Sequence, residues 1–358
     1  MIIDRITLRN FRSYEYVDVT LKEGLNAIVG PNGSGKTNLA EAIQYLSLGR
    51  SFRTSDDKDL IKKDATLAQI DASTRLGSAK NQIRINLSRD SKTLLINSKK
   101  INKLSLLSSV MNVIIFKPSD VNLFKSSPSV RRKFLDIAIS KQNDIYLENL
   151  SNYNKLIKER NELLKAEEID KLHISVIDEQ LSSLALSISR ERDRYITSIN
   201  KVLSVVVNSL SSEKATLEIK YHPFVNLSDT NRKEVLNIYN AYLESDIKSG
   251  STSVGPHRED FETIYNGNDI ATYGSQGENR LSAIALILTP CFLITDEDKK
   301  PIVILDDVLS ELDDTHRDKL LKFMSKFRQC IITATECNYT GCACIYEINK
   351  NKITRREP

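Results

Sequence analysis

Hydrophobic and polar residues alternate with a period of two along the first third of the chain. The pattern is clearest in IIDRITL (2–8), EYVDVTL (15–21), TLAQIDAST (66–74), QIRINLS (82–88) and TLLIN (93–97). Such alternation is typical of strands with one buried face, and polar turns separate these runs. A further apolar run, LNAIVG (25–30), predicts a core strand that ends at Gly30. We therefore expect an antiparallel sheet section beside a core strand.

The middle of the chain has a different pattern. No glycine occurs between Gly77 and Gly250, and no proline occurs between Pro128 and Pro223. Strong helix formers dominate there, as in NKLIKERNELLKAEEIDKL. The sequence therefore predicts a mainly helical lobe over residues 120–250. An apolar seam with a heptad period is not sustained, which argues against a long coiled coil.

Strand patterns return after residue 254, in DFETIYN (260–266), PIVILDD (301–307) and QCIITAT (329–335). Between them we expect helices that begin at Gln276 and near Asp313. The order sheet, helices, sheet predicts an α/β fold in which residues 1–119 and 251–358 form one lobe and the helical lobe is an insertion.

Composition narrows the class of protein only slightly. Hydrophobic residues make up 40% and charged residues 27% of the 358 positions, an ordinary balance for a globular chain. The net charge of +4 permits nucleic-acid binding without arguing for it. The first residues lack the continuous apolar core of a signal peptide. No window approaches about 18 uninterrupted apolar residues, so we expect no membrane association through a spanning helix.

Five cysteines are present, four of them close together near the end of the chain: Cys330, Cys337, Cys342 and Cys344. We expect reduced thiols in a cytoplasmic protein. The alternative is a metal site built from the last three, although no fourth ligand stands at a usual spacing.

The strongest chemical signal is GPNGSGKT (30–37), which matches the phosphate-binding pattern GxxxxGK[ST] in full. It follows an apolar strand and precedes a predicted helix (38–48), which is the context that this motif requires. Glycines let the backbone amides surround a phosphate, and the helix N-terminus attracts negative charge. Lys36 would reach the β- and γ-phosphates of ATP, and Thr37 would bind Mg²⁺. The predicted nucleotide-binding residues here are Gly30, Asn32, Gly33, Ser34, Gly35, Lys36, Thr37 and Asn38.

A second half of the site follows from PIVILDDVLSELD (301–313), an apolar strand that ends in two carboxylates. Asp306 is placed to hold Mg²⁺, and Asp307 to polarise the attacking water. An acidic helix N-cap after a strand is the structural alternative. The two motifs lie near opposite ends of the chain. A large insertion between them is the arrangement of ABC-type ATPases, which include the SMC-like heads.

The stretch YGSQGENR (273–280) has a phosphate-site turn without a lysine. It resembles the signature turn of ABC-type ATPases, which caps the γ-phosphate bound by a second subunit. Ser275, Gln276 and Gly277 would then supply donors to the nucleotide of a partner copy. This interpretation predicts an ATP-dependent homodimer with two composite sites. The alternative is an ordinary helix N-terminus that contains a glycine. SELD (310–313) resembles the D-loop of the same ATPases.

Six stretches together resemble the RecF family of bacterial recombination mediator ATPases. They are LRNFRSY (8–14), GPNGSGKTNLAEAI (30–43), FKPSDVNLFKSSPSVRRKFLD (116–136), SVGPHREDF (253–261), YGSQGENR (273–280) and ILDDVLSELD (304–313). The resemblance implies an ABC-type head that dimerises on ATP, binds double-stranded DNA at junctions with single-stranded gaps, and hydrolyses ATP slowly. It further implies that RecR and RecO are partners and that RecA is loaded onto DNA as a result.

The resemblance also assigns roles to single residues. Lys36, Ser275 and Asp307 carry over as catalytic residues, and Thr37 and Asp306 as Mg²⁺ ligands. Arg280 would neutralise the partner's γ-phosphate, and Arg12 in the NFRS turn would touch the nucleotide. Two departures from transporter ATPases stand out. Ala334 follows Thr333 where those ATPases have a histidine, and no Q-loop glutamine can be placed.

Several interpretations stay open. Arg131, Arg132 and Lys133 would grip DNA phosphates or form a solvated or internally paired helix face. His257 would contact DNA or an interface, or is a loop histidine with internal partners. The roles of Glu278 and Asn279 are not assigned. The competing functions are the ATPase subunit of a transporter and an SMC-like or overcoming-lysogeny-type head, for which an attached hinge or nuclease would be expected.

Overall fold

The computed structural model describes residues 1–339, 341–349 and 352–356, without the side chains of Ser105 and Glu311. The chain forms two compact units. Unit 1 comprises Met1–Val121, Val205–Ala215 and Arg280–Pro358, and unit 2 comprises Asn122–Ser204 and Thr216–Asn279. The helical unit therefore begins close to the predicted boundary. It also contains residues 251–279, which the sequence placed in the other lobe, because β10 (Asp260–Tyr265) of this segment pairs with β9 (Leu217–His222).

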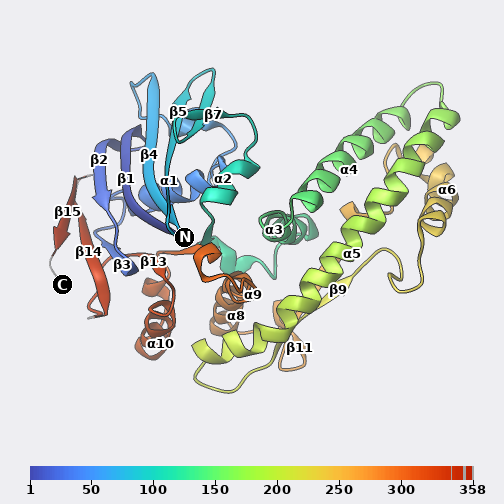
Figure 1. Ribbon diagram of the computed structural model, residues 1–358. Coiled ribbons are helices and arrows are strands. Elements are labelled where there is room, and N and C mark those ends of the chain that lie inside the picture. The colour runs from blue at the N-terminus through green and yellow to red at the C-terminus, as the bar shows by residue number, and fades with distance from the viewer. Residues whose placement is uncertain (340, 350–351, 357–358) are drawn as a thin grey trace. The chain divides into compact units, whose positions relative to one another are not determined.

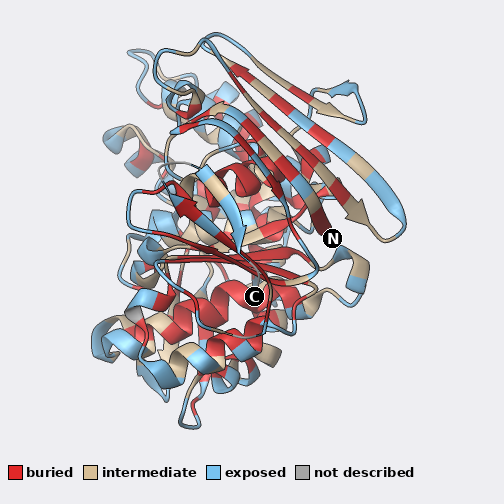
Figure 2. Ribbon diagram, turned by 90° about the vertical axis from the view of Figure 1, so that its left-hand side faces the viewer, coloured by how far each residue is buried: buried red, intermediate tan, exposed pale blue. Residues whose placement is uncertain are grey.

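The first sheet of unit 1 is antiparallel and has the strand order β2-β1-β4-β5-β6-β7. Its strands are β1 (Ile2–Phe11), β2 (Tyr14–Thr20), β4 (Leu67–Leu76), β5 (Ala79–Ser88), β6 (Lys92–Ile96) and β7 (Lys99–Ile101). Buried residues alternate with intermediate or exposed ones along β4 and the second half of β5, as one buried face requires (Figure 2). The predicted antiparallel section is thus confirmed, with β7 as an addition.

The second sheet of unit 1 has the order β15-β14-β3-β13-β12-β8. Its strands are β3 (Gly24–Val29), β8 (Val113–Phe116), β12 (Ile302–Asp306), β13 (Gln329–Ala334), β14 (Cys342–Asn349) and β15 (Lys352–Arg356). All neighbours are parallel except β14 and β15. Strands β12 and β13 are buried along their whole length, which explains why they read as unbroken apolar runs.

Helix α1 (Lys36–Leu48) packs against strands of both sheets of unit 1 (Figure 1). Ten of its residues are buried, and its apolar side chains join one core with both sheets. The shorter helices of this unit are α2 (Ser105–Val110), α9 (Pro290–Leu293) and α10 (Asp314–Met324), with 3-10 turns at Asp57–Leu60, Glu297–Lys299 and Leu309–Glu311. Only the loop 30–35 separates β3 from α1, and the core holds the strand and the helix at its two ends.

Unit 2 is mainly helical, as predicted. It contains α3 (Pro128–Ser140), α4 (Asp144–Leu163), α6 (Arg232–Ser249), α7 (Ile270–Tyr273) and most of α5 (Lys171–Leu210). A small sheet joins β9 (Leu217–His222), β10 (Asp260–Tyr265) and β11 (Asn268–Asp269). A short 3-10 turn spans Pro256–Arg258, and α8 (Gln276–Leu288) begins at the end of the unit. Among the residues that the structure describes, no helix has the length and apolar character of a membrane span.

Candidate functional site

The loop between β3 and α1 has the backbone of a phosphate-binding loop. Gly30, Gly33 and Gly35 all have positive φ angles, of +156°, +79° and +109°. A Cβ on Gly30 would overlap the carbonyl oxygen of Ile348 on β14, so only glycine fits there. Nothing lies within 4 Å of a Cβ placed on Gly33. The loop is therefore packed tightly on the sheet at one end and open at its tip.

Lys36 spans this loop from the first turn of α1. Its Nζ donates hydrogen bonds to the carbonyl oxygens of Gly30 at 2.6 Å and Pro31 at 3.0 Å. Burial lowers the pKa of Lys36, although the carboxylates of Asp306 and Asp307 oppose the shift. The ammonium group is thus held by two weak acceptors at the mouth of the loop, where an anion would bind it more strongly.

Asp306 is the last residue of β12, and its carboxylate contacts Thr37 in the first turn of α1. Its Oδ1 accepts a hydrogen bond from Thr333 Oγ1 at 2.6 Å and one from Thr37 Oγ1 at 3.2 Å. Burial raises the pKa of Asp306, and the neighbouring charge of Asp307 raises it further. A carboxylate and a hydroxyl side by side are the donors that Mg²⁺ takes from P-loop proteins. The two residues predicted as metal ligands are therefore in contact.

Asp307 follows β12 and has a φ of +52°. Its backbone N–H donates to Thr333 Oγ1 at 2.9 Å, and its carbonyl accepts from Ser310 Oγ at 3.2 Å. A non-glycine residue with positive φ is uncommon, and such strain is typical of functional sites. Thr333 thus holds both carboxylate residues, a role that sequence reasoning missed because it noted Thr333 only as the neighbour of Ala334.

Arg12 lies at the turn between β1 and β2 with a φ of +53°. Its guanidinium forms a two-pronged ion pair with the fully buried Glu41 of α1, at 2.9 and 2.7 Å. Arg53 also reaches Glu41, at 3.3 Å, and donates to Asn38 Oδ1 at 2.8 Å. Arg12 therefore stands beside the loop, but its side chain is engaged by Glu41.

Glu41 and Arg53 are site residues that sequence reasoning missed. The positive charge of Arg53 opposes the upward shift of the Asp306 pKa, so this arginine is close enough to act on the carboxylate. Arg53 stands in GRSFR (49–53), shortly after the helix that follows the phosphate loop, and this position of a basic residue could have indicated it.

The signature turn lies in unit 2 and forms a capping box on α8. The backbone N–H of Ser275 donates to Glu278 Oε2 at 2.8 Å, and that of Glu278 donates to Ser275 Oγ at 3.2 Å. Asn279 Nδ2 donates to the carbonyl oxygens of Gly274 and Ser275 at 2.9 and 2.8 Å. Glu278 and Asn279, left unassigned by the sequence, therefore hold the turn. Gly277 has open space where a side chain would stand.

The basic cluster 131–133 is mostly paired inside unit 2. Arg131 forms an ion pair with Asp260, with Nε to Oδ1 at 2.8 Å, and Arg132 donates to the carbonyl oxygen of Glu259 at 2.7 Å. Lys133 is exposed. The internally paired alternative thus describes the two arginines.

His257 also has internal partners. Its Nε2 lies 3.0 Å from the carbonyl oxygen of Thr252, so this nitrogen carries the proton. Its Nδ1 then accepts from the Tyr153 hydroxyl at 2.7 Å. Burial lowers the pKa of His257 to about 4. The ring is therefore a neutral histidine with internal partners, as the structural alternative expected.

Within the described ranges, no three His, Cys, Asp or Glu side chains gather as a metal site. Cys337, Cys342 and Cys344, the alternative metal ligands, form no such group of three in the described part of the chain. All five cysteines are buried and none forms a disulfide.

Comparisons with known proteins agree with this geometry. The model of the RecF/RecN/SMC N terminal domain matches residues 2–354. DNA replication and repair protein RecF of Geobacillus thermodenitrificans is 36% identical over 94% of this chain and 93% of its own length. The RecF of Clostridium novyi is 37% identical over 94% of this chain and 93% of its own.

Solved structures give the same result. A recombination mediator protein RecF with ATP, from the RecFOR pathway, is 32% identical, with a TM-score of 0.89 and 99% of both chains covered. An Smc head domain of Pyrococcus furiosus matches with a TM-score of 0.61 at 18% identity, over 99% of this chain and 96% of its own, which concerns the fold alone. The predicted fold class, an α/β ABC-type head with an antiparallel section and an inserted helical lobe, is confirmed.

Proposed function

The chain belongs to the RecF family, and from this membership and the geometry above we propose that it is an ATP-dependent DNA-binding protein of recombinational repair. Its ATP-bound homodimer would bind double-stranded DNA next to single-stranded gaps and hydrolyse ATP slowly, with stimulation by DNA. The observation that carries the proposal is the contact of Thr37 with Asp306 beside the glycine loop, because it joins both halves of an ATPase site.

The residues present fit ATP and Mg²⁺. Besides the open glycine loop, the Ser34 hydroxyl is buried without a partner among the described atoms, and Lys36 Nζ rests on two carbonyl oxygens. We assign the phosphates to Gly30 and residues 32–38, which include Lys36, and Mg²⁺ to Thr37 and Asp306. Bound ATP supplies the γ-phosphoryl group that water attacks. Asp307 would orient that water and accept its proton.

The signature turn would act on a second copy of the chain. Ser275, the amides of Gln276 and Gly277, and Arg280 would supply donors and charge to the γ-phosphate held by the partner. The capping box on α8 supports this assignment, since it holds the turn at a helix N-terminus with open space at Gly277. Arg12 would contribute only after a rearrangement of its ion pair with Glu41.

The pathway proposal rests on the relatives. We propose RecR and RecO as partners and RecA loading as the outcome, within the DNA-damage (SOS) response and in the cytoplasm. In the 131–133 cluster, both arginines are paired within the helical unit and only Lys133 is exposed. Lys133 is therefore the candidate of this cluster for contact with DNA.

The test is the molar mass in solution by light scattering without nucleotide, with ADP and with ATP-Mg²⁺, each with and without a short DNA duplex. Ser275→Arg is compared with Ser228→Arg, which places the same charge on an exposed loop of unit 2. We expect ATP-Mg²⁺ to double the mass of wild type and of Ser228→Arg. Ser275→Arg should bind ATP equally well but stay monomeric. A mass that ignores ATP, or a dimer of Ser275→Arg, would refute the composite site.

A further inference from the structure

Two cysteines meet beside the second sheet of unit 1, which also carries the candidate site. Cys337 lies in the segment after β13, and Cys342 is the first residue of β14. Their Sγ atoms are 3.7 Å apart and share a hydrogen bond. Both side chains are mostly buried, at 8% and 6% exposure. A disulfide needs an Sγ–Sγ distance of about 2.05 Å, so a side-chain rotation and a small backbone adjustment would join them.

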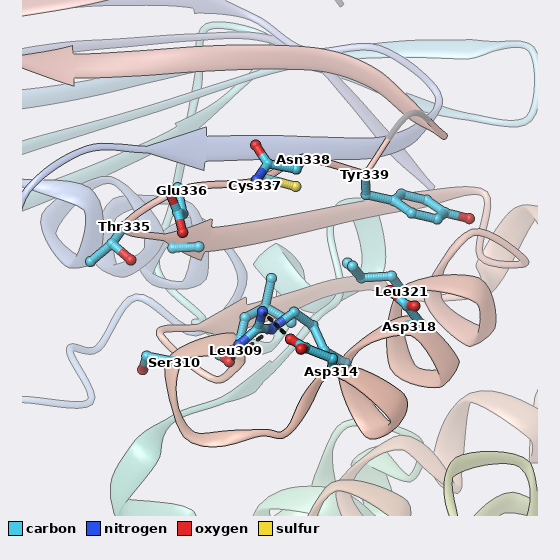
Figure 3. Close-up of a pocket in the computed structure, with 12 residues that line it drawn as sticks. Leu309, Ser310, Asp314, Asp318, Leu321, Thr335, Glu336, Cys337, Asn338 and Tyr339 are labelled. Atoms are coloured by element: carbon cyan, nitrogen blue, oxygen red, sulfur yellow. Dashed lines mark hydrogen bonds and ion pairs between the residues drawn. The ribbon is translucent and has the colours of Figure 1, made fainter.

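A pocket of about 340 Å³ gives access to one of the two thiols. The segment Thr335–Tyr339 forms one wall, and Leu309, Ser310 and the start of α10 form the other (Figure 3). Cys337 lines this pocket, whereas Cys342 does not. The pair is therefore asymmetric: a small reagent in the pocket reaches Cys337 first, and Cys342 lies behind it.

The hydrogen bond also makes the pair chemically asymmetric. The contact with Cys342 lowers the pKa of Cys337, and the same contact, together with burial, raises the pKa of Cys342. The thiolate is the nucleophile in thiol–disulfide exchange, so Cys337 is the attacking sulfur. Cys330, a neighbouring thiol, differs because it is fully buried and burial raises its pKa.

The strands on either side of the cysteine pair also belong to the sheet that carries the candidate ATPase site. Thr333, four residues before Cys337, holds Asp306 and the backbone of Asp307. Strand β14, which begins with Cys342, pairs with β3, the strand that leads into the glycine loop. Ser310, on the opposite wall of the pocket, donates to the carbonyl oxygen of Asp307. A covalent link between the cysteines would therefore restrain the chain that follows Thr333 and the start of β14.

We propose that Cys337 and Cys342 form a thiol-oxidation site that a low-molecular-weight disulfide enters through the pocket. The Cys337 thiolate attacks one sulfur of the reagent and releases the other as a thiolate, which leaves a mixed disulfide on Cys337. Cys342, on losing its proton, attacks Cys337 Sγ and releases the second half of the reagent. The sum is one reagent disulfide reduced to two thiols and one protein disulfide formed. The predicted effect on ATP hydrolysis rests on the proposed function; the chemistry of the site does not.

The test uses the full chain and oxidised glutathione as the probe, with the products located by peptide mass spectrometry. We expect wild type to form the Cys337–Cys342 disulfide. Cys342→Ser should stop at a single glutathione adduct on Cys337, and Cys337→Ser should form neither product. Cys291→Ser, a buried cysteine of α9, is the matched control and should behave as wild type. Alkylation of the reduced protein should modify Cys337 at least ~10-fold faster than Cys330.

An adduct of Cys342→Ser on another cysteine, or a wild-type protein that stays reduced while Cys337 alkylates no faster than Cys330, would overturn the site. ATP hydrolysis is measured separately. It should fall several-fold in oxidised wild type, recover with a reductant, and stay unchanged in treated Cys337→Ser. If the disulfide forms but ATP hydrolysis does not change, the link between the cysteines and ATP hydrolysis is refuted, whereas the oxidation site stands. If the chain has no ATPase activity, the proposed function fails, and mass spectrometry still decides whether the oxidation site exists.

Discussion

Acidification should destabilise the protein through His257. The ring is neutral in the folded protein because Nε2–H donates to the Thr252 carbonyl and Nδ1 accepts from Tyr153. Burial is the main cause that lowers its pKa to about 4, and the nearby charges of Arg258 and Arg132 add to it. The hydrogen bond to Thr252 and the charge of Asp246 oppose the shift only in part.

Proton linkage determines the sign and the size of the change in the free energy of unfolding. The folded-state pKa lies below the ordinary value of 6.5, so the unfolded chain binds more protons between these two values. The stability that the neutral ring contributes is complete above pH 6.5 and is lost as the pH falls towards 4. With these pKa values, the free energy of unfolding should be about 2 kcal/mol lower at pH 5 than at pH 7.5 from this group alone.

The assay is urea unfolding followed by circular dichroism at both pH values, for wild type and for His257→Gln. The variant lacks the titrating ring, so its loss between the two pH values should be smaller than that of wild type by about 2 kcal/mol. An NMR titration of the four histidines gives an independent readout, since one ring that is missing from His257→Gln should titrate near pH 4. Equal pH dependence in both proteins, or a His257 that titrates near 6.5, would refute the reasoning.

Three further substitutions test other parts of the structure. Arg160→Met removes a fully buried cation that holds two buried aspartates at 2.6 and 2.7 Å, and should lower the free energy of unfolding by ~3–5 kcal/mol in urea; a loss below ~1 kcal/mol would contradict this. Asp307→Asn should slow ATP hydrolysis at least ~100-fold in a phosphate-release assay while ATP still drives dimerisation, and an unchanged rate would exclude Asp307 as the base. Thr333→Val removes the hydroxyl shared by Asp306 and Asp307 and should slow hydrolysis ~10-fold, whereas Thr333→Ser should stay close to wild type; equal rates in the two variants would show that the hydroxyl is not needed.

Local patterns were sufficient for much of the fold. The two-residue period predicted β1, β2, β4, β5 and β6, and continuous apolar runs predicted β3, β12 and β13. These predictions succeed because a strand with one buried face must alternate and a doubly buried one must be apolar throughout. Strands β8, β9, β14 and β15 were missed. β8 has only four residues, β9 lies within the stretch predicted as the helical lobe, and β14 begins among cysteines beside Gly341.

The candidate site divides in the same way. The spacing of GPNGSGKT and the carboxylates after an apolar strand identified the residues that the structure brings together, Thr37 and Asp306. Such motifs can be predicted from the sequence because their backbone conformation depends on glycines within a few positions. The sequence did not predict that residues 251–279 belong to the helical unit, because this depends on the pairing of β10 with β9, some 40 positions earlier in the chain.

By itself, the sequence determined the family, the glycine loop, the pair of residues proposed to bind Mg²⁺ and the existence of a helical insertion. Only the tertiary structure decided which charges are engaged: Arg12 with Glu41, Arg131 with Asp260, and a neutral His257 with Tyr153. It also decided that Cys337 meets Cys342 beside a pocket. The physical reason is that motif geometry is set by neighbouring backbone torsions, whereas the state of a charge or a thiol depends on burial and on partners that folding brings from distant parts of the chain.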